Sequence, residues 1–205
     1  MVDRSRRDFL RLSLALKAGL ALGAGWPAAA AARGMRPTPS CGEGAGPTAP
    51  QTEGPYFKPE SPLRASLVEP GTKGTPMTLA GRVLLTDCTP VARALVDFWH
   101  ADDDGEYDLS GYRLRGHQLT DAEGRYTLET IVPGVYPGRT RHFHVKVQAP
   151  GGRVLTTQLY FPGEPANRRD RIFDPALVVA LDGGDRRRAR FDFVLAQTAA
   201  GRRGA

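Results

Sequence analysis

Histidine and cysteine are scarce in this sequence of 205 residues, which holds four histidines and two cysteines. Basic residues interleaved with aromatic ones, as on nucleic-acid-binding surfaces, are missing, so we expect no nucleic-acid partner. The net charge of +6 is misleading, because residues 1–32 carry five basic and two acidic residues and leave +3 for the remainder. An arginine cluster at 186–190 could attract polyanions, but the interpretation that we favour is a solvated basic turn.

A long amphipathic helix is also missing beyond residue 32, while 17 prolines and 24 glycines indicate many turns. Short segments with β character recur instead, separated by turns such as DAEG, APGG and DGGD. We therefore predict an all-β fold, a β-sandwich of mostly antiparallel strands with long functional loops. The strands are expected at residues 78–86, 94–100, 125–131, 142–149, 154–161, 177–182 and 188–196.

Residues 1–32 are predicted to be a secretory signal, with a basic start, a weakly apolar run and small residues at the end. The stretch SRRDFL at 5–10 resembles the twin-arginine signal, an export address that implies folding, often around a cofactor, before transport. Lys17 and three glycines make the apolar run a poor membrane span. We expect a periplasmic or extracellular protein without a stable membrane anchor.

The remaining chain divides into a flexible arm at 33–50, one domain at 51–196 and a tail at 197–205. Cys41 lies in the arm and Cys88 in the turn TDCTP. In an oxidising compartment an isolated pair favours a disulfide over a metal site, and two unpaired thiols are the alternative. A bridge between them would tie the arm to the domain.

Two of the four histidines stand one residue apart in the predicted strand HFHVKVQA, at His142 and His144. Residues i and i+2 of a strand face the same side, so both imidazoles can reach one metal ion while Phe143 points into the core. Taken alone, this H-x-H pattern is weak, because many strands carry such a pair on a solvated face.

Two tyrosines on polar, glycine-containing segments strengthen the case for a metal site. Tyr136 lies in the turn VPGVYPG just before the histidine strand, and Tyr107 lies in the loop DDDGEYDLSGY. A phenol has a pKa near ~10, so only a hard, highly charged cation would stabilise its phenolate. Two histidines with two tyrosinates suit ferric iron, whereas zinc sites more often combine His with Cys or a carboxylate.

Five segments, in order, resemble the intradiol ring-cleavage dioxygenases, especially the protocatechuate 3,4-dioxygenase-like members. They are TEGPYF at 52–57, DCTPVARALVDFWHADDDGEY at 87–107, TDAEGRYTLETIVPGVYPGR at 120–139, HFHV at 142–145 and TTQLYFPGEP at 156–165. The resemblance implies a mononuclear non-haem Fe(III) held by Tyr107, Tyr136, His142 and His144, in which Tyr136 leaves the metal when substrate binds. It also implies insertion of both atoms of O₂ into a catechol-type substrate, which opens between its two hydroxylated carbons to a cis,cis-muconate-type diacid.

The same resemblance assigns further roles around the metal. Arg139 would stabilise negative charge on the substrate ring, and Gln158 would support the site from the TTQ strand. Trp99 and Tyr56 are expected near the substrate pocket, although packing in the core or the arm is an alternative for each.

Several histidines and tyrosines remain outside this assignment. Tyr112 is the rival of Tyr107 as a ligand, and Tyr126 is expected to be structural. For His100 and His117 we expect partly exposed polar positions.

The chain departs from the family where PGRTR separates Tyr136 from His142, a shorter run than in the best-known members. A more open substrate pocket would follow. The sequence does not identify which catechol is the substrate. One chain holds the arm motif and all four predicted ligands. The oligomeric state can therefore be either a homo-oligomer or a monomer. The alternatives to a dioxygenase are a β-sandwich binding module and a zinc-dependent hydrolase built on H-x-H.

Overall fold

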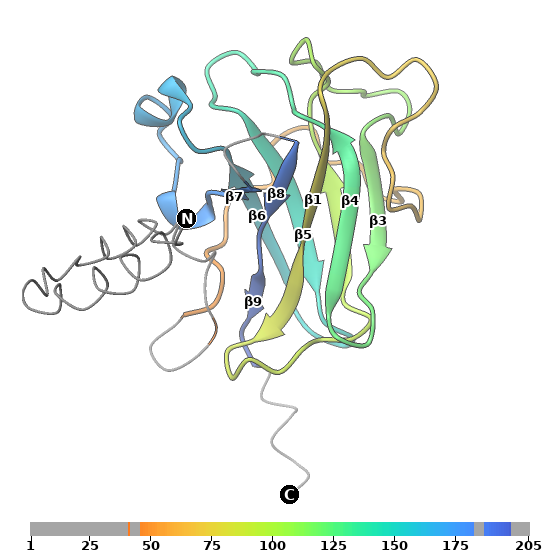
Figure 1. Ribbon diagram of the computed structural model, residues 1–205, viewed down its shortest axis with the longest axis vertical. Helices are drawn as coiled ribbons and strands as arrows, with labels where there is room; N and C mark the ends of the chain where they lie inside the picture. The colour runs from red at the N-terminus through yellow and green to blue at the C-terminus, as the bar shows by residue number, and fades with distance from the viewer. Residues whose placement is uncertain (1–40, 42–45, 183–186, 198–205) are drawn as a thin grey trace, which may run out of the picture. The chain divides into compact units, whose positions relative to one another are not determined.

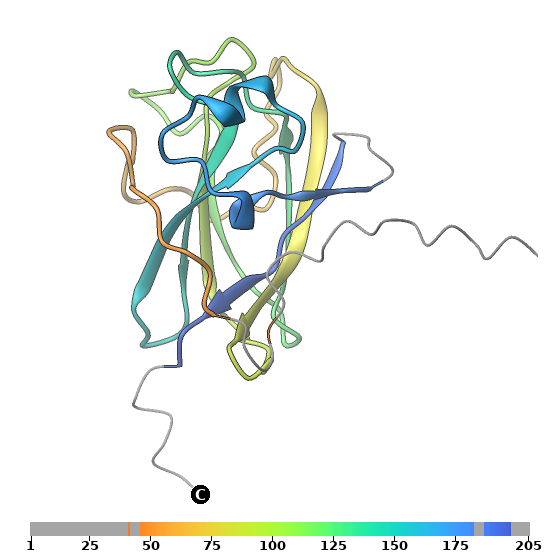
Figure 2. The same cartoon turned by 90° about the vertical axis from the view of Figure 1, so that its left-hand side faces the viewer.

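The structure, a computed structural model, describes residues 41, 46–182 and 187–197. The predicted signal and most of the predicted arm and tail lie outside these residues. The described chain folds into two β-sheets that form two layers (Figures 1 and 2), and the predicted all-β sandwich is thereby confirmed. None of the described helices is long and apolar enough to cross a membrane.

The first sheet is built around its longest strand, β1 (Pro76–Leu85). Strand β4 (Arg125–Ile131) pairs with β1 in the antiparallel sense, and β7 (Ala180–Leu181) pairs with β8 (Arg188–Arg190) in the same sense. In contrast, β8 and β9 (Phe193–Leu195) run parallel to β1. The predicted strand 188–196 is therefore two short strands interrupted at residues 191–192.

The second sheet has the order β3-β2-β5-β6 and is antiparallel throughout. It comprises β2 (Leu95–Trp99), β3 (Arg115–Leu119), β5 (His142–Gln148) and β6 (Val154–Tyr160). Strand β3 was not predicted, because its sequence RGHQL lacks apolar alternation. Two short 3₁₀ helices, η1 (Pro165–Arg168) and η2 (Pro175–Leu177), follow β6, and η2 occupies the start of the strand predicted at 177–182.

The core lies between the sheets and is filled by alternating apolar side chains. On β5, Phe143, Val145 and Val147 point into it and are fully buried. The opposite face of the first half of this strand is buried as well, so β5 is covered on both sides where the two histidines stand. The second covering layer comes from loops and from the segment that precedes β1.

From residue 46 onward, that segment runs alongside β6 (orange in Figure 2). The Thr48 N–H donates to the Val194 carbonyl at 2.8 Å, and the Gln51 N–H donates to the Thr156 carbonyl at 2.8 Å. A disulfide joins Cys41 to Cys88, whose Cα atoms are 5.0 Å apart. This end of the predicted flexible arm has no regular structure but is held against the domain.

Candidate metal centre

His142 and His144 are the first and third residues of β5, and they project to the same side of the sheet. Both are buried, and their Nε2 atoms lie 3.1 Å apart. Strand pairing fixes the backbone of His144 on both sides, opposite Trp99 of β2 and Gln158 of β6, and that of His142 on one side, opposite Tyr160 of β6. The spacing of i and i+2 thus places two imidazoles together on a rigid support.

The protonation of His142 follows from its hydrogen bonds. Its Nδ1 lies 2.6 Å from the Thr140 carbonyl, which can only accept, so Nδ1 carries the proton and Nε2 has a free lone pair. Burial lowers the pKa of His142 to about 4 and that of His144 well below its usual value. Both rings are therefore neutral at pH 7, and His142, whose other nitrogen bonds to a carbonyl, has the usual form of a metal ligand.

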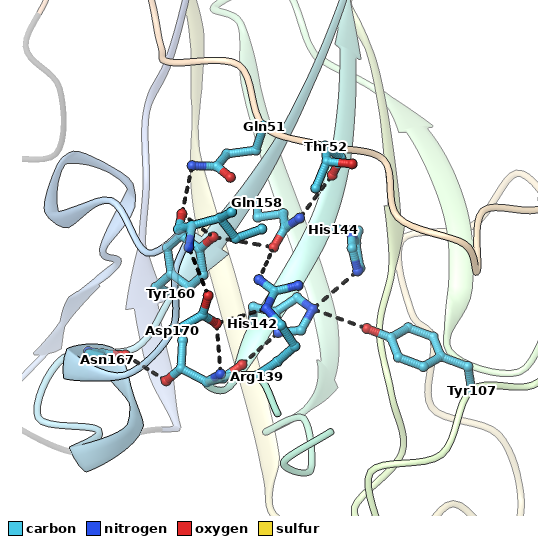
Figure 3. Close-up of polar contacts among 12 residues, drawn as sticks. Gln51, Thr52, Tyr107, Arg139, His142, His144, Gln158, Tyr160, Asn167 and Asp170 are labelled. Carbon is cyan, nitrogen blue, oxygen red and sulfur yellow. Dashed lines mark hydrogen bonds and ion pairs between the residues drawn. The ribbon is translucent and has the colours of Figure 1, made fainter. Parts of the chain in front are cut away.

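Tyr107 reaches this pair from the loop that follows β2. Its hydroxyl oxygen lies 3.3 Å from Nε2 of His142, and Figure 3 shows the hydroxyl directed at the two histidines. Burial raises the pKa of Tyr107 far above its ordinary value, so the protein alone holds this side chain as a neutral phenol. Only a nearby cation would make the phenolate stable here.

Tyr136 lies at the edge of the same group and is paired with Tyr56. Their hydroxyls are 2.6 Å apart, and the Tyr136 ring lies 5.9 Å from the Tyr107 ring between centroids. Tyr56 also stacks on Tyr107, with ring centroids 4.4 Å apart and planes 17° from parallel. The hydrogen bond to Tyr136, with a smaller effect of burial, raises the pKa of Tyr56.

These donor atoms fit a metal ion. Two nitrogens about 2.1 Å from one ion and at right angles to each other lie about 3.0 Å apart, close to the separation of the two Nε2 atoms. Within the described parts of the chain, no three side chains of His, Cys, Asp and Glu lie close enough together to hold a metal ion. The tyrosines beside the two histidines can supply further oxygen donors, and two histidines with two tyrosinates suit ferric iron.

Tyr112, the sequence-based rival of Tyr107, has its hydroxyl elsewhere. It donates to the Pro59 carbonyl at 3.1 Å, and the Lys58 ammonium lies 4.2 Å from the centre of its ring. The geometry therefore favours Tyr107 as the donor.

Arg139 and Gln158 form a polar network beside the histidines (Figure 3). The guanidinium of Arg139 donates to Oε1 of Gln158 at 2.7 Å and to Oδ2 of Asp170 at 2.8 Å. Gln158 in turn donates to the Thr52 carbonyl at 2.9 Å. Burial would raise the pKa of Asp170, but hydrogen bonds from the Thr140 N–H and from Arg139 outweigh it, and the pKa is lowered.

Sequence reasoning missed Asp170, because it lies in the charged run NRRDRIFD, where nothing distinguishes it from its neighbours. It also missed Gly54, which has φ +73°; a Cβ added there would lie 3.1 Å from Cε1 of His144. The glycine two residues before Tyr56 in the arm motif TEGPYF was the only available signal for this close approach.

Trp99 is buried and stacks on the His144 ring, with centroids 4.9 Å apart and planes 6° from parallel. Trp99 therefore packs against the ring of His144, a predicted ligand, and is not exposed to solvent. The expectation for His100 was wrong: it is 2% exposed, because its two ring nitrogens bond to the Ala101 carbonyl and the Thr130 hydroxyl.

His117 is half-buried and bonds to the Ser61 hydroxyl at 3.1 Å. Tyr126 lies in the core and donates to the Phe191 carbonyl at 2.8 Å, as its structural assignment requires.

Comparison with known proteins identifies the class that this fold and site define. A family model described as Dioxygenase matches residues 52–197, and the chain belongs to the intradiol ring-cleavage dioxygenase family. It is 34% identical over 139 residues to hydroxyquinol 1,2-dioxygenase of Rhizobium sp. (strain MTP-10005), covering 56% of this chain and 47% of that protein. It is 32% identical over 183 residues to the enzyme of the same name from Nocardioides simplex, covering 70% and 62%.

A solved structure offers a closer match in sequence. The dioxygenase domain of a dioxygenase carbohydrate-binding protein fusion from Streptomyces sp. SirexAA-E is 56% identical, with a TM-score of 0.72. The match covers 75% of this chain and all of that chain. The chain spans about half to three fifths of the length of the two curated relatives named above.

Proposed function

We propose that this protein is an intradiol dioxygenase that inserts both atoms of O₂ into a catechol-type aromatic compound. The observation that carries the proposal is the convergence on Nε2 of His142, which lies 3.3 Å from the Tyr107 hydroxyl and 3.1 Å from Nε2 of His144, with Tyr136 beside Tyr107. These four residues would hold one ferric ion. When bound, the ion would supply the Lewis acidity and redox character that ring opening requires.

The chain's own residues prepare the site in three ways. Burial keeps His142 and His144 neutral, so that their Nε2 lone pairs are available at pH 7. The loop after β2 places the Tyr107 hydroxyl beside them. Tyr56 gives the Tyr136 hydroxyl a hydrogen-bond partner, so Tyr136 can yield its place to a substrate hydroxyl without leaving its oxygen unpaired.

Arg139 supplies the positive charge of the site. Its ion pair with Asp170 and its hydrogen bond to Gln158 hold the guanidinium beside β5, where it would stabilise negative charge that develops on the substrate ring. A planar guanidinium held by two neighbours is oriented before substrate arrives, and this preorganisation is what electrostatic stabilisation depends on.

The substrate class is supported by relatives whose names specify hydroxyquinol, catechol and chlorocatechol. The particular catechol is best decided by a panel of catechol, protocatechuate, hydroxyquinol and bulkier lignin-like catechols. A ring-opened diacid that carries both atoms of labelled O₂ is expected, whereas a single labelled atom would indicate a monooxygenase.

Colour provides the decisive test of the metal site. Charge transfer from tyrosinate to Fe(III) should make the iron-loaded protein red-brown. We expect Tyr107→Phe to weaken or shift the visible band. Tyr112→Phe, the matched control, should leave the band unchanged, because the Tyr112 hydroxyl bonds to Pro59. A colourless wild-type protein after iron loading would refute the proposal and favour a zinc hydrolase or a binding module.

We further propose export by the twin-arginine route to the periplasm or the cell exterior. The proposal rests on the SRRDFL stretch, which lies outside the described residues, and on the disulfide between Cys41 and Cys88, since disulfides persist in oxidising compartments. Replacing Arg6 and Arg7 by lysine should keep the protein in the cytoplasm.

A further inference from the structure

Arg115, at the start of β3, is a buried arginine that the proposed chemistry does not use. Only 2% of its surface is exposed, and in the described part of the chain it forms no ion pair. An arginine stays protonated in proteins, and burying its charge is unfavourable unless hydrogen bonds compensate. The bonds that Arg115 makes therefore indicate its purpose.

All three nitrogens of the guanidinium donate to backbone carbonyls on two separate segments. Nε and Nη2 donate to the Asp108 carbonyl at 3.1 and 2.9 Å, and Nη1 donates to the Tyr56 carbonyl at 2.7 Å. Asp108 directly follows Tyr107 in the chain. One side chain thus joins the backbone of Tyr56 to the backbone beside Tyr107, although Tyr56 and Asp108 lie 59 and 7 residues from Arg115.

The local backbone is shaped to direct this side chain inward. Leu114, the residue before Arg115, has φ +54°, a left-handed conformation that a branched side chain rarely adopts. The N–H of Arg115 then donates to the Tyr112 carbonyl at 3.2 Å, which closes the loop onto the strand. A strained residue next to a buried cation is a pattern that functional sites commonly show.

We propose that Arg115 is a positioning residue that holds Tyr56 and Tyr107 in their stacked arrangement. The stack places the Tyr107 hydroxyl 3.3 Å from His142 and the Tyr56 hydroxyl 2.6 Å from Tyr136. The same clamp therefore sets the position of one proposed metal ligand and of the partner of another. This role in catalysis rests on the proposed function.

A lysine cannot replace this clamp, because a single ammonium lacks the planar fork that reaches two carbonyls at once. Arg115→Lys therefore keeps the charge and removes the geometry. The matched control is Arg113→Lys on the same loop, since the Arg113 side chain is 51% exposed and pairs only with Asp102 among the contacts described.

The first measurement uses the metal-free protein, so it does not depend on the proposed function. With 3-fluorotyrosine in all six tyrosine positions, fluorine NMR reports each ring separately. We expect Arg115→Lys to shift the Tyr56 and Tyr107 signals and to leave the signal of Tyr126, a core tyrosine, in place. Arg113→Lys should shift none of the three. Unchanged Tyr56 and Tyr107 signals in a folded Arg115→Lys protein would overturn the proposal.

The second measurement uses the iron-loaded protein. Arg115→Lys should displace the visible band and lower kcat by about 10- to 100-fold, as expected when a reacting group is misplaced by about 1 Å. A wild-type kcat and band in this variant would overturn the catalytic role. If the wild type itself shows no band, the proposed function fails, and the fluorine spectra still decide whether Arg115 positions the two tyrosines.

If Arg115→Lys does not fold, a measurement on the wild-type protein still tests the proposal. The Nε proton of Arg115 should exchange slowly with solvent and show a hydrogen-bond coupling to the Asp108 carbonyl carbon. Free exchange of this proton would contradict the clamp.

Discussion

At Gly54 the segment before β1 passes close to His144, one of the proposed metal ligands. Its φ of +73° is strained for any residue with a Cβ, and an added Cβ would lie 3.1 Å from Cε1 of His144. Gly54→Ala therefore combines two effects. The left-handed conformation costs roughly 1–2 kcal/mol, and the close contact shifts the His144 ring by a few tenths of an ångström.

Gly151→Ala separates these effects. Gly151 lies in the turn between β5 and β6 with φ +68°, and an added Cβ would have no atom within 4 Å. The conformational strain is thus nearly equal in the two variants, and it is partly offset by about 0.4–1 kcal/mol from the stiffer unfolded chain. Urea unfolding of the metal-free proteins should show a loss of roughly 1 kcal/mol for Gly151→Ala and a larger loss for Gly54→Ala.

Ferric-ion titration, followed by the visible band, supplies the second half of the test. We expect about a 10- to 100-fold loss of affinity in Gly54→Ala, similar to the effect of disturbing the partners of a metal ligand. Gly151→Ala should bind the ion as tightly as the wild type. Wild-type affinity and colour in Gly54→Ala would refute the placement of this segment against a ligand, and equal losses in both variants would trace the effect to backbone strain alone.

Two further predictions concern carboxylates. Asp170→Asn should lower kcat by about 10- to 100-fold, because Arg139 loses its ion pair. The control variant Asp174→Asn, in the same loop, should leave kcat unchanged. Equal kcat values for the two variants would refute the role of the ion pair. Hydrogen bonding by the Arg125 N–H lowers the pKa of Asp121 in the turn before β4. Because the folded pKa is the lower one, this stabilisation is present at pH 7 and is lost as the pH falls through that pKa. Asp121→Asn should therefore lose less free energy of unfolding than the wild type between pH 7 and pH 3, and an equal loss would contradict the shift.

Much of the fold followed from the sequence, because most strands obey the alternation of buried and exposed residues. Strand β4 has this pattern from Arg125 to Thr130, and it pairs with β1 as an ordinary antiparallel neighbour. Strand β3 could not be found in this way, because Arg115 and Gln118 take buried positions that alternation reserves for apolar residues. The Arg115 guanidinium and the side-chain oxygen of Gln118 find hydrogen-bond partners on other segments, which local sequence does not reveal.

The same limit applies to the environment of single residues. The two-residue period of a strand was enough to place His142 and His144 on one face, and it needed no knowledge of the rest of the chain. The burial of His100 depends on the Thr130 hydroxyl, 30 residues away, and on the Ala101 carbonyl. The part played by Asp170 depends on a loop that returns to β5 after β6. Long-range partners of this kind decide whether a polar side chain is buried, and a single sequence does not specify them.

The division of the site between strand and loops bears on its proposed chemistry. His142 and His144 are anchored by β6 on one side, and His144 also by β2 on the other, so they can hold an ion without moving. Tyr136 lies outside any strand, in a turn where Gly138 has φ +82°. Its hydroxyl already has a partner in Tyr56 that belongs to a different segment. A ligand that must yield to substrate is expected on such a turn, whereas the two histidines, which must stay, lie on a paired strand.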